Sequence, residues 1–267
     1  MDTNLSIRDA VDFINKLKNE FDWQDLSRDT IMDIGCGDRF YCSQAIIHLY
    51  SDFKCLIACD KSEDLLRWRP PRNKQFEKLH KNNIIKLLVA DIENSTFFED
   101  YTESVDKIVS RNVLYQVHNK LEALRNIYKT LKPGGAAAVL FWLDNPIVTW
   151  ANKMISTRKW SRYVERSKPL PPYFPAKLPE HSYWAEMKYL GCRDVHTVIQ
   201  SIPYSFSSDE ECRGQLASVV DEMFNIPPER REEFNDDCLR IFKQLVGCKS
   251  GGSITFDVID LFLHIVK

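Results

Sequence analysis

The sequence predicts an α/β fold built on a doubly wound, mostly parallel sheet of seven strands with helical cap insertions. Short apolar runs alternate with segments of helical periodicity, an alternation typical of a parallel sheet. The first apolar run, 30–34, leads into a Gly-x-Gly turn and a helix-like segment, which is how a doubly wound sheet begins. The last run, 253–266, alternates in polarity, and we expect it to form an antiparallel final strand.

The remaining elements follow from apolar periodicity and from the residues that begin and end helices. After the strand at 30–34, further strands are expected at 55–59, 84–90, 105–110, 136–143, 195–206 and 253–266. Helices are expected over 7–20, 41–50, 64–68, 120–131, 182–190, 208–224 and 228–246. The turn Lys132-Pro-Gly-Gly135 is expected to end one helix and start the fifth strand, and Gly191 to stop another helix.

The length of 267 residues suits one domain over 1–267 with sizeable insertions. The periodic pattern is lost between 145 and 179, where aromatic side chains stand among prolines and basic residues. We expect 145–180 and the helical pair within 207–250 to be insertions that cover the substrate.

Composition excludes several classes of partner. The formal net charge is −2, so the chain lacks the basic field typical of nucleic-acid binding. It contains no apolar run near the roughly 18 residues that span a bilayer and no apolar signal-peptide core. The eight cysteines form no paired Cys-x-x-Cys spacing, and no histidines accompany them as zinc ligands. We expect a cytoplasmic monomer or homodimer that takes a small molecule and binds no metal.

The glycine turn contains the first candidate binding residues. Gly35 and Gly37 can take positive φ and let a ligand approach the backbone, and Cys36 between them is expected to pack in the loop. Phe40 stands where a dinucleotide fingerprint has its third glycine, and Asp33 before the turn suits a cationic ligand better than a pyrophosphate. The alternative is a turn in which glycine serves geometry alone.

Two more acids end the next strands. Asp60 can accept hydrogen bonds from both ribose hydroxyls of a nucleoside, and Asp91 can accept one from an adenine amine while Ile92 flanks the ring. Ligands bind at the carboxyl edge of such sheets, where these acids would gather. One such acid alone would be more typical of a helix N-terminus, which favours negative charge, but three in register with a glycine turn favour nucleoside binding.

These motifs together resemble the class I S-adenosylmethionine (SAM) dependent methyltransferases. They are Asp33-x-Gly-x-Gly, Asp60, Ala90-Asp91-Ile92 and Leu131-Lys-Pro-Gly-Gly135. The resemblance implies a Rossmann-like fold, SAM as cofactor and S-adenosylhomocysteine as product. The cofactor-binding residues expected from it and from the strand ends are Asp33, Gly35, Cys36, Gly37, Asp60, Lys61, Asp91, Ile92, Ser110 and Arg111.

A narrower resemblance is to the arthropod juvenile hormone acid methyltransferases. It rests on Asp144-Asn-Pro-Ile147 leading to Lys159-Trp160, on Phe224-Asn-Ile-Pro227 and on the final strand. That family methylates the carboxyl group of farnesoic or juvenile hormone acid and is similar to bacterial trans-aconitate methyltransferases. Gln116 stands here where that family has a tryptophan over the substrate, and Ser6 matches a glutamine of its longer amino-terminal arm.

A carboxylate acceptor is already ionised at neutral pH, so its methylation needs no general base. Gln116 and Tyr115 are the candidates for positioning it, because an amide can hold a carboxylate. The substrate-side candidates are Ser6, Gln116, Trp142, Trp150 and Trp160. For each tryptophan taken singly, ordinary core or interface packing is the favoured interpretation.

Three alternatives stay open. The acceptor can be another small molecule, an amine, a thiol or a different acid, and His118 would then be a candidate base. The chain can also bind SAM without catalysis. An NAD-dependent oxidoreductase is disfavoured by Phe40.

Overall fold

The computed structural model describes residues 3–63, 73–165, 178–221, 223–248 and 253–267, with the side chains of 3–6 and 97 left aside. The helix expected at 64–68 lies outside these residues. Seven strands form one sheet in the order β3-β2-β1-β4-β5-β7-β6. Their bounds are β1 Thr30–Ile34, β2 Cys55–Asp60, β3 Ile85–Val89, β4 Val105–Arg111, β5 Leu131–Asp144, β6 Asp194–Phe206 and β7 Ile254–Val266.

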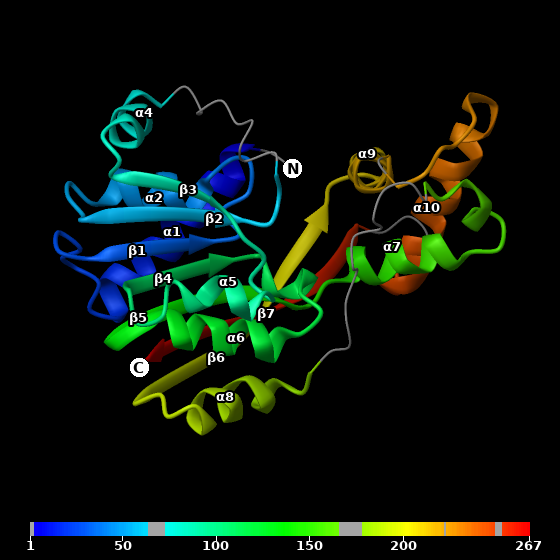
Figure 1. The fold of residues 1–267 in the computed structure, drawn as a ribbon. Coiled ribbons are helices and arrows are strands. Elements are labelled where there is room, and N and C mark those ends of the chain that lie inside the picture. The colour runs from blue at the N-terminus through cyan, green and yellow to red at the C-terminus, as the bar shows by residue number, and fades with distance from the viewer. Residues whose placement is uncertain (1–2, 64–72, 166–177, 222, 249–252) are drawn as a thin grey trace. The chain divides into compact units, whose positions relative to one another are not determined.

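The sheet confirms the predicted fold class. Strands β1 to β5 pair in parallel, and β7 runs opposite to β5 (Figure 1). The helices are α1 Thr3–Glu20, α2 Tyr41–Leu49, α4 Lys74–Lys81, α5 Ser95–Glu99, α6 Lys120–Thr130, α7 Pro146–Ser156, α8 Glu180–Tyr189, α9 Asp209–Val220 and α10 Arg231–Leu245. Three short 3₁₀ turns are η1 Leu114–Gln116, η2 Ser161–Tyr163 and η3 Pro228–Arg230. None of the described helices is long and apolar enough to cross a membrane.

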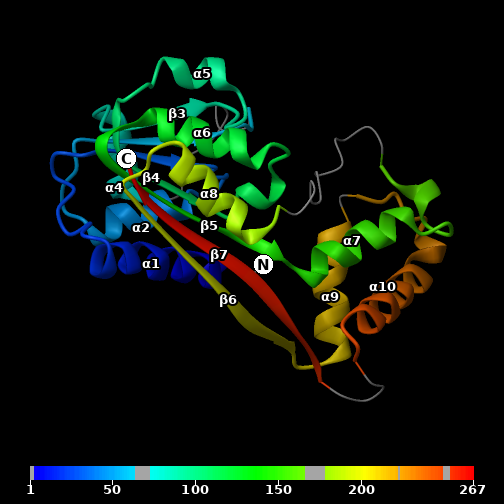
Figure 2. The same cartoon turned by 90° about the horizontal axis from the view of Figure 1, so that it is seen from below.

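The chain divides into two compact units. The first contains Met1–Phe141, Leu178–Val198 and Leu261–Lys267, and the second contains Trp142–Lys177 and Ile199–Asp260. Segments 145–180 and 207–250, expected as insertions, fall mainly in the second unit. In the first unit, α1, α2 and α4 cover one face of the sheet and α5, α6 and α8 cover the other (Figure 2).

Strand β1 illustrates why the centre of the sheet holds together. Ile31 and Met32 are fully buried on opposite faces, because helices cover both sides of a parallel sheet. The chain order reverses between β1 and β4, so that β2 and β3 lie on one side and β5 on the other. At such a reversal the loops diverge and leave a crevice at the carboxyl ends of the strands.

Two local predictions are corrected. Helix α7 fills part of the stretch that we expected to be irregular: Asn145 caps it by accepting from the backbone N of Ile147 at 3.0 Å, and Pro146 occupies its first turn. The Lys-Pro-Gly-Gly segment lies inside β5 rather than before it, at a register shift opposite Val105 and Lys107. A Cβ at Gly135 would lie 2.9 Å from the carbonyl oxygen of Lys132, so this irregularity requires glycine.

Candidate functional site

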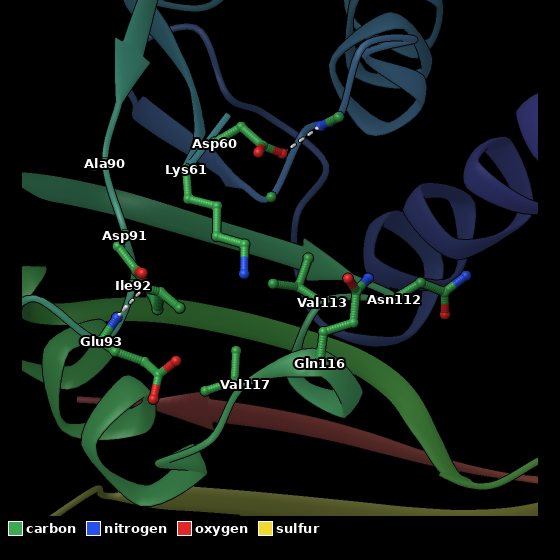
Figure 3. A pocket seen from close by; sticks show the side chains of 12 residues that line it. Asp60, Lys61, Ala90, Asp91, Ile92, Glu93, Asn112, Val113, Gln116 and Val117 are labelled. Carbon is green, nitrogen blue, oxygen red and sulfur yellow. Dashed lines mark hydrogen bonds between the residues drawn. The ribbon is translucent and has the colours of Figure 1, made fainter. Parts of the chain in front are cut away.

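A cavity of about 230 Å³ lies at the carboxyl ends of β1, β2, β3 and β4 in the first unit (Figure 3). This is the crevice that the reversal of strand order predicts. Its walls come from the glycine turn after β1, the ends of β2 and β3, and the segment after β4. The lining residues are Gly35, Gly37, Asp60, Lys61, Ala90, Asp91, Ile92, Glu93, Asn112, Val113, Gln116 and Val117.

The two glycines of the turn have different tasks. Gly35 has φ +74°, and a Cβ there would lie 2.0 Å from Cγ2 of Val113, so the turn packs directly on the segment after β4. The backbone N of Gly35 donates to the carbonyl of Cys59 at 2.7 Å, which fixes the turn to β2. A Cβ at Gly37, with φ +62°, would meet nothing within 4 Å. Gly37 therefore leaves room for a ligand to approach the backbone.

Asp60 is fixed at the cavity wall by backbone groups. Its Oδ2 accepts from the N–H of Gly37 at 2.9 Å, and its Oδ1 accepts from the N–H of Ser62 at 3.0 Å. These bonds orient the carboxylate without neutralising it, and an oxygen can accept more than one donor. Lys61 follows, and its side chain extends into the cavity (Figure 3).

Asp91 and Ile92 place a carboxylate beside an apolar surface. Oδ1 of Asp91 accepts from the N–H of Glu93 at 3.0 Å, while Ile92 is nearly buried. Nδ2 of Asn126 donates to the carbonyl of Ile92 at 2.8 Å and holds this loop against α6. A carboxylate next to an aliphatic side chain suits a flat heteroaromatic ring that has an exocyclic amine.

Asp33 lies behind the cavity rather than in its wall. It is 1% exposed, and its Oδ2 accepts from the backbone N of Ser43 at 2.9 Å and from the Ser43 hydroxyl at 2.6 Å. Burial raises the pKa of Asp33 to about 6, against the opposing effects of Ser43 and Arg111. The carboxylate thus joins β1 to the first turn of α2, and its expected contact with the ligand stays a prediction.

Three other predicted cofactor residues also lie outside the lining. Burial above all, with Asp33 and Asp60 adding to it, raises the pKa of the Cys36 thiol, so Cys36 stays protonated and packs in the turn. Ser110 is fully buried, and its hydroxyl has no hydrogen-bond partner within the described residues. The Arg111 guanidinium is 4.0 Å from the Asp9 carboxylate of α1. The binding roles of these three residues stay predictions.

Of the predicted substrate residues, Gln116 lines the cavity, and its side chain points into it (Figure 3). Trp150 and Trp160 are fully buried in the second unit, where their indole N–H groups donate to the Cys238 carbonyl at 2.9 Å and to Oδ2 of Asp237 at 3.1 Å. Core packing therefore accounts for both side chains. Substrate roles for these two tryptophans stay predictions, and so do those of the three remaining candidates. Tyr115 lies in η1, Trp142 packs against the core of the second unit, and the Ser6 side chain is outside the described residues.

The structure adds wall residues that the sequence analysis did not assign. Asn112 follows β4 with φ +58°, a left-handed conformation that asparagine tolerates better than most residues. Val113 and Val117 supply apolar surface, and Glu93 adds a carboxylate. Glu93 follows the Asp91-Ile92 motif but was not predicted, and nothing in the local pattern marks the two valines.

The lining fits a cationic nucleoside better than a dinucleotide. The lining contains three carboxylates, those of Asp60, Asp91 and Glu93, and one ammonium, that of Lys61, so its excess negative charge would repel a pyrophosphate. Phe40, in place of the third fingerprint glycine, is fully buried against Phe76. Among the residues that the structure describes, no cluster of His, Cys, Asp or Glu is placed to hold a metal ion.

Comparisons with known proteins agree with this geometry. Residues 32–139 match a family model described as a methyltransferase domain. The chain is 23% identical over 243 residues to a juvenile hormone acid O-methyltransferase of Bombyx mori, covering 91% of this chain and 84% of that protein. It is 20% identical over 235 residues to a protein of the same name from Drosophila melanogaster, covering 87% and 77%.

The fold is also similar to that of a solved SAM-dependent methyltransferase from Archaeoglobus fulgidus. The TM-score is 0.52 at 12% identity, and the match covers 99% of this chain and 94% of that one. A likeness at this identity concerns the fold alone, whereas the family match covers the glycine turn and the strand ends that form the cavity. Residues 32–139 therefore match a methyltransferase domain, and the chain as a whole is distantly similar to the juvenile hormone acid O-methyltransferases.

Proposed function

We propose that the protein transfers the methyl group of SAM to the carboxylate of a small, largely apolar acid and forms a methyl ester. The observation that carries the proposal is the position of Gln116, whose amide faces the cavity beside the apolar Val113 and Val117. An amide can donate hydrogen bonds to a carboxylate while the valines contact a hydrocarbon chain. The curated relatives, named for their action on juvenile hormone acid, support the same acceptor class.

In this proposal each wall of the cavity holds one part of the cofactor. Asp60 accepts the ribose hydroxyls, Asp91 accepts the adenine amine, and Ile92 contacts the adenine ring. The open backbone at Gly37 lets the cofactor lie close to the turn. SAM supplies a methyl group on a positively charged sulfonium, a charge that the carboxylates of the wall favour.

In this proposal Asp60 and Asp91 hold the cofactor and Glu93 accepts from backbone N–H groups, which favours an acceptor that needs no general base. No histidine, cysteine or tyrosine is among the described residues that line the cavity, and His118 is exposed outside it. A carboxylate, with an unperturbed pKa of about 4, attacks without losing a proton. Catalysis then rests on orientation, which can contribute about 7–11 kcal/mol.

The test is to incubate the protein with SAM and farnesoic acid and to measure the methyl ester by mass spectrometry. Farnesol, which has the same hydrocarbon chain but no carboxylate, is the matched control and should give no product. Gln116→Ala should raise the KM for the acid at least tenfold while leaving the Kd for SAM within about threefold. An absence of ester from a protein that binds SAM would contradict the proposal.

A second candidate is methyl transfer to a cationic amine. The specific observation in its favour is the excess of carboxylates over ammonium groups in the lining, which attracts a cation more than an anion. A panel of amines, thiols and acids, assayed through release of S-adenosylhomocysteine, distinguishes the two candidates. Turnover with amines alone would favour this second function, and SAM binding without turnover on any acceptor would indicate a non-catalytic SAM-binding protein.

A further inference from the structure

Glu93 connects two parts of the cavity wall that are distant in sequence. Its Oε1 accepts from the backbone N of Asn119 at 2.7 Å, and its Oε2 accepts from that of His118 at 3.3 Å. These two N–H groups belong to the N-cap residue of α6 and to the residue before it, immediately after the segment with Gln116 and Val117. Figure 3 shows the Glu93 side chain directed from the loop after β3 toward this segment.

One further contact joins the same parts, and a second holds the segment before α6 to the start of that helix. Asn126, fully buried in α6, donates through Nδ2 to the carbonyl of Ile92 at 2.8 Å. Lys120 is 5% exposed, and its Nζ donates to the carbonyl of Val117 at 2.8 Å. The loop that contains Asp91 and Ile92 is thus attached to the first turns of α6.

Ordinary helix capping does not account for Glu93. The side chain of Asn119 already caps α6 locally, because its Oδ1 accepts from the backbone N of Glu122 at 3.1 Å. Glu93 is a second cap that comes from another strand end, at a sequence distance of 25 and 26 residues. It satisfies the N–H of Asn119, which the helix start leaves unpaired, and its negative charge is favoured there.

We propose that Glu93 is a positioning residue that couples the cofactor side of the cavity to its acceptor side. Cofactor bound against Asp91 and Ile92 orders their loop, and Glu93 transmits this order to the segment 116–119. Gln116 is then fixed only when the methyl donor is in place. The role of Gln116 as acceptor contact rests on the proposed function, whereas the coupling itself does not.

The test measures amide hydrogen exchange with and without S-adenosylhomocysteine, a readout that needs no acceptor. The informative amides are those of Gln116 and Val117, because they donate to the carbonyls of Val113 and Leu114 and not to Glu93. In the native protein the ligand should slow their exchange at least tenfold. In Glu93→Ala this slowing should fall below twofold. The amides of residues 90–94, which lie on the cofactor side, should still exchange more slowly when the ligand is bound.

Two variants separate coupling from mere stability. Asn119→Ala removes the local cap of α6 but keeps the backbone N–H that donates to Glu93, so the tenfold slowing should remain. Glu93→Gln keeps one acceptor oxygen, so it should retain part of the ligand-induced slowing that Glu93→Ala loses. Glu93→Ala should also raise the KM for farnesoic acid at least tenfold, with the Kd for SAM changed less than threefold.

The outcomes are distinct from those that test the proposed function. Ligand-induced slowing at Gln116 and Val117 that survives in Glu93→Ala overturns the coupling, and so does its absence from the native protein. Loss of slowing in Asn119→Ala as in Glu93→Ala also overturns it, because destabilisation of α6 would then suffice. A protein that does not methylate farnesoic acid but loses coupling in Glu93→Ala alone supports this inference and rejects the acceptor.

Discussion

The cavity wall of the first unit and the core of the second unit satisfy their polar groups in opposite ways. At the cavity, Asp60 and Asp91 accept from backbone N–H groups of neighbouring loops and still line an open space. In the second unit, polar groups pair mainly with other side chains: Asp237 accepts from both Lys159 and Trp160. Arg230 lies 4.7 Å from the centre of the Trp160 ring.

This difference shows which sequence signals predict a site. Sheet topology brings the carboxylates at the carboxyl ends of β2 and β3, Asp60 and Asp91, to the cavity, although it leaves Asp33 of β1 behind the wall. Tryptophans and basic residues in an unpatterned stretch have no such constraint, and here they stabilise one another. We therefore expect substitutions in the cavity wall to change ligand binding and substitutions in the core of the second unit to change stability.

Trp150→Ala should have the largest effect and should act on stability. Trp150 is fully buried, donates to the Cys238 carbonyl and packs edge-on against Phe242. Its removal should lower the free energy of unfolding by about 3–5 kcal/mol, measured by urea denaturation. The matched control is Trp184→Ala, at a side chain 45% exposed, which should change stability by less than about 0.5 kcal/mol. A Trp150→Ala protein that keeps its stability but loses acceptor binding would restore the substrate role.

Asp60→Ala should weaken SAM binding about 100-fold, which is about 2.7 kcal/mol. The reason is that Asp60 lines the cavity with a carboxylate already oriented by Gly37 and Ser62. Asp33→Asn is the matched control, because the amide oxygen can still accept from Ser43 behind the wall. Calorimetry should show a change of less than about threefold for this control. Equal losses in the two variants would place Asp33 in contact with the ligand after all.

His264 should make the first unit sensitive to acid. It is 5% exposed, its ring packs at a tilt against Phe21 with ring centres 4.2 Å apart, and Nε2 lacks a hydrogen-bond partner within the described residues. Burial first, and then the charges of Lys107 and His196, lower the pKa of His264 to about 4, with Asp194 opposing. The unfolded chain, with a histidine pKa near 6.5, therefore binds more protons between these values, and stability falls as the pH falls from 6.5 to 4.

The measurement is the free energy of unfolding at pH 7 and pH 4.5 for the native protein and for His264→Phe. The phenylalanine keeps the ring packing but cannot be protonated. The acid-induced loss should be smaller in the variant, by on the order of 2 kcal/mol. An identical loss in both proteins would show that His264 is not the group responsible.

Much of the first unit could be predicted from the sequence, because its signals are local. Strand β1 has the predicted bounds, and six of the ten residues expected to bind the cofactor line the cavity. Asp33 could not be placed, since its burial depends on Ser43 in the following helix. Glu93 was missed for a related reason: its hydrogen-bond partners are 25 and 26 residues away and are backbone groups, which leave no mark in the sequence.

The second unit was less predictable because its signals conflict. The stretch 145–179 was expected to lack regular structure because its periodic pattern is lost, but Pro146 is favourable at the first turn of a helix, and Asn145 before it is a good cap. Trp150 and Trp160 suggest a binding surface by residue type alone. Only the packing partners, Cys238 and Asp237 in α10, reveal that they belong to a core.

Asp237→Asn should have the smallest effect and should depend on pH and salt. Burial by itself would raise the pKa of Asp237, but hydrogen bonds from Lys159, Arg240 and Trp160 outweigh it and lower the pKa below its usual value. The carboxylate therefore stabilises the fold above pH 4, and this contribution is lost as the pH falls through the folded-state pKa.

Asparagine keeps an acceptor for the Trp160 indole, so the loss of stability at pH 7 should stay below about 1 kcal/mol and shrink in 1 M salt. Asp237→Ala, which leaves that buried N–H unpaired, should cost about 1–3 kcal/mol at any salt concentration. Equal losses in the two variants would mean that the charge, and not the hydrogen bond to Trp160, is what the core of the second unit needs.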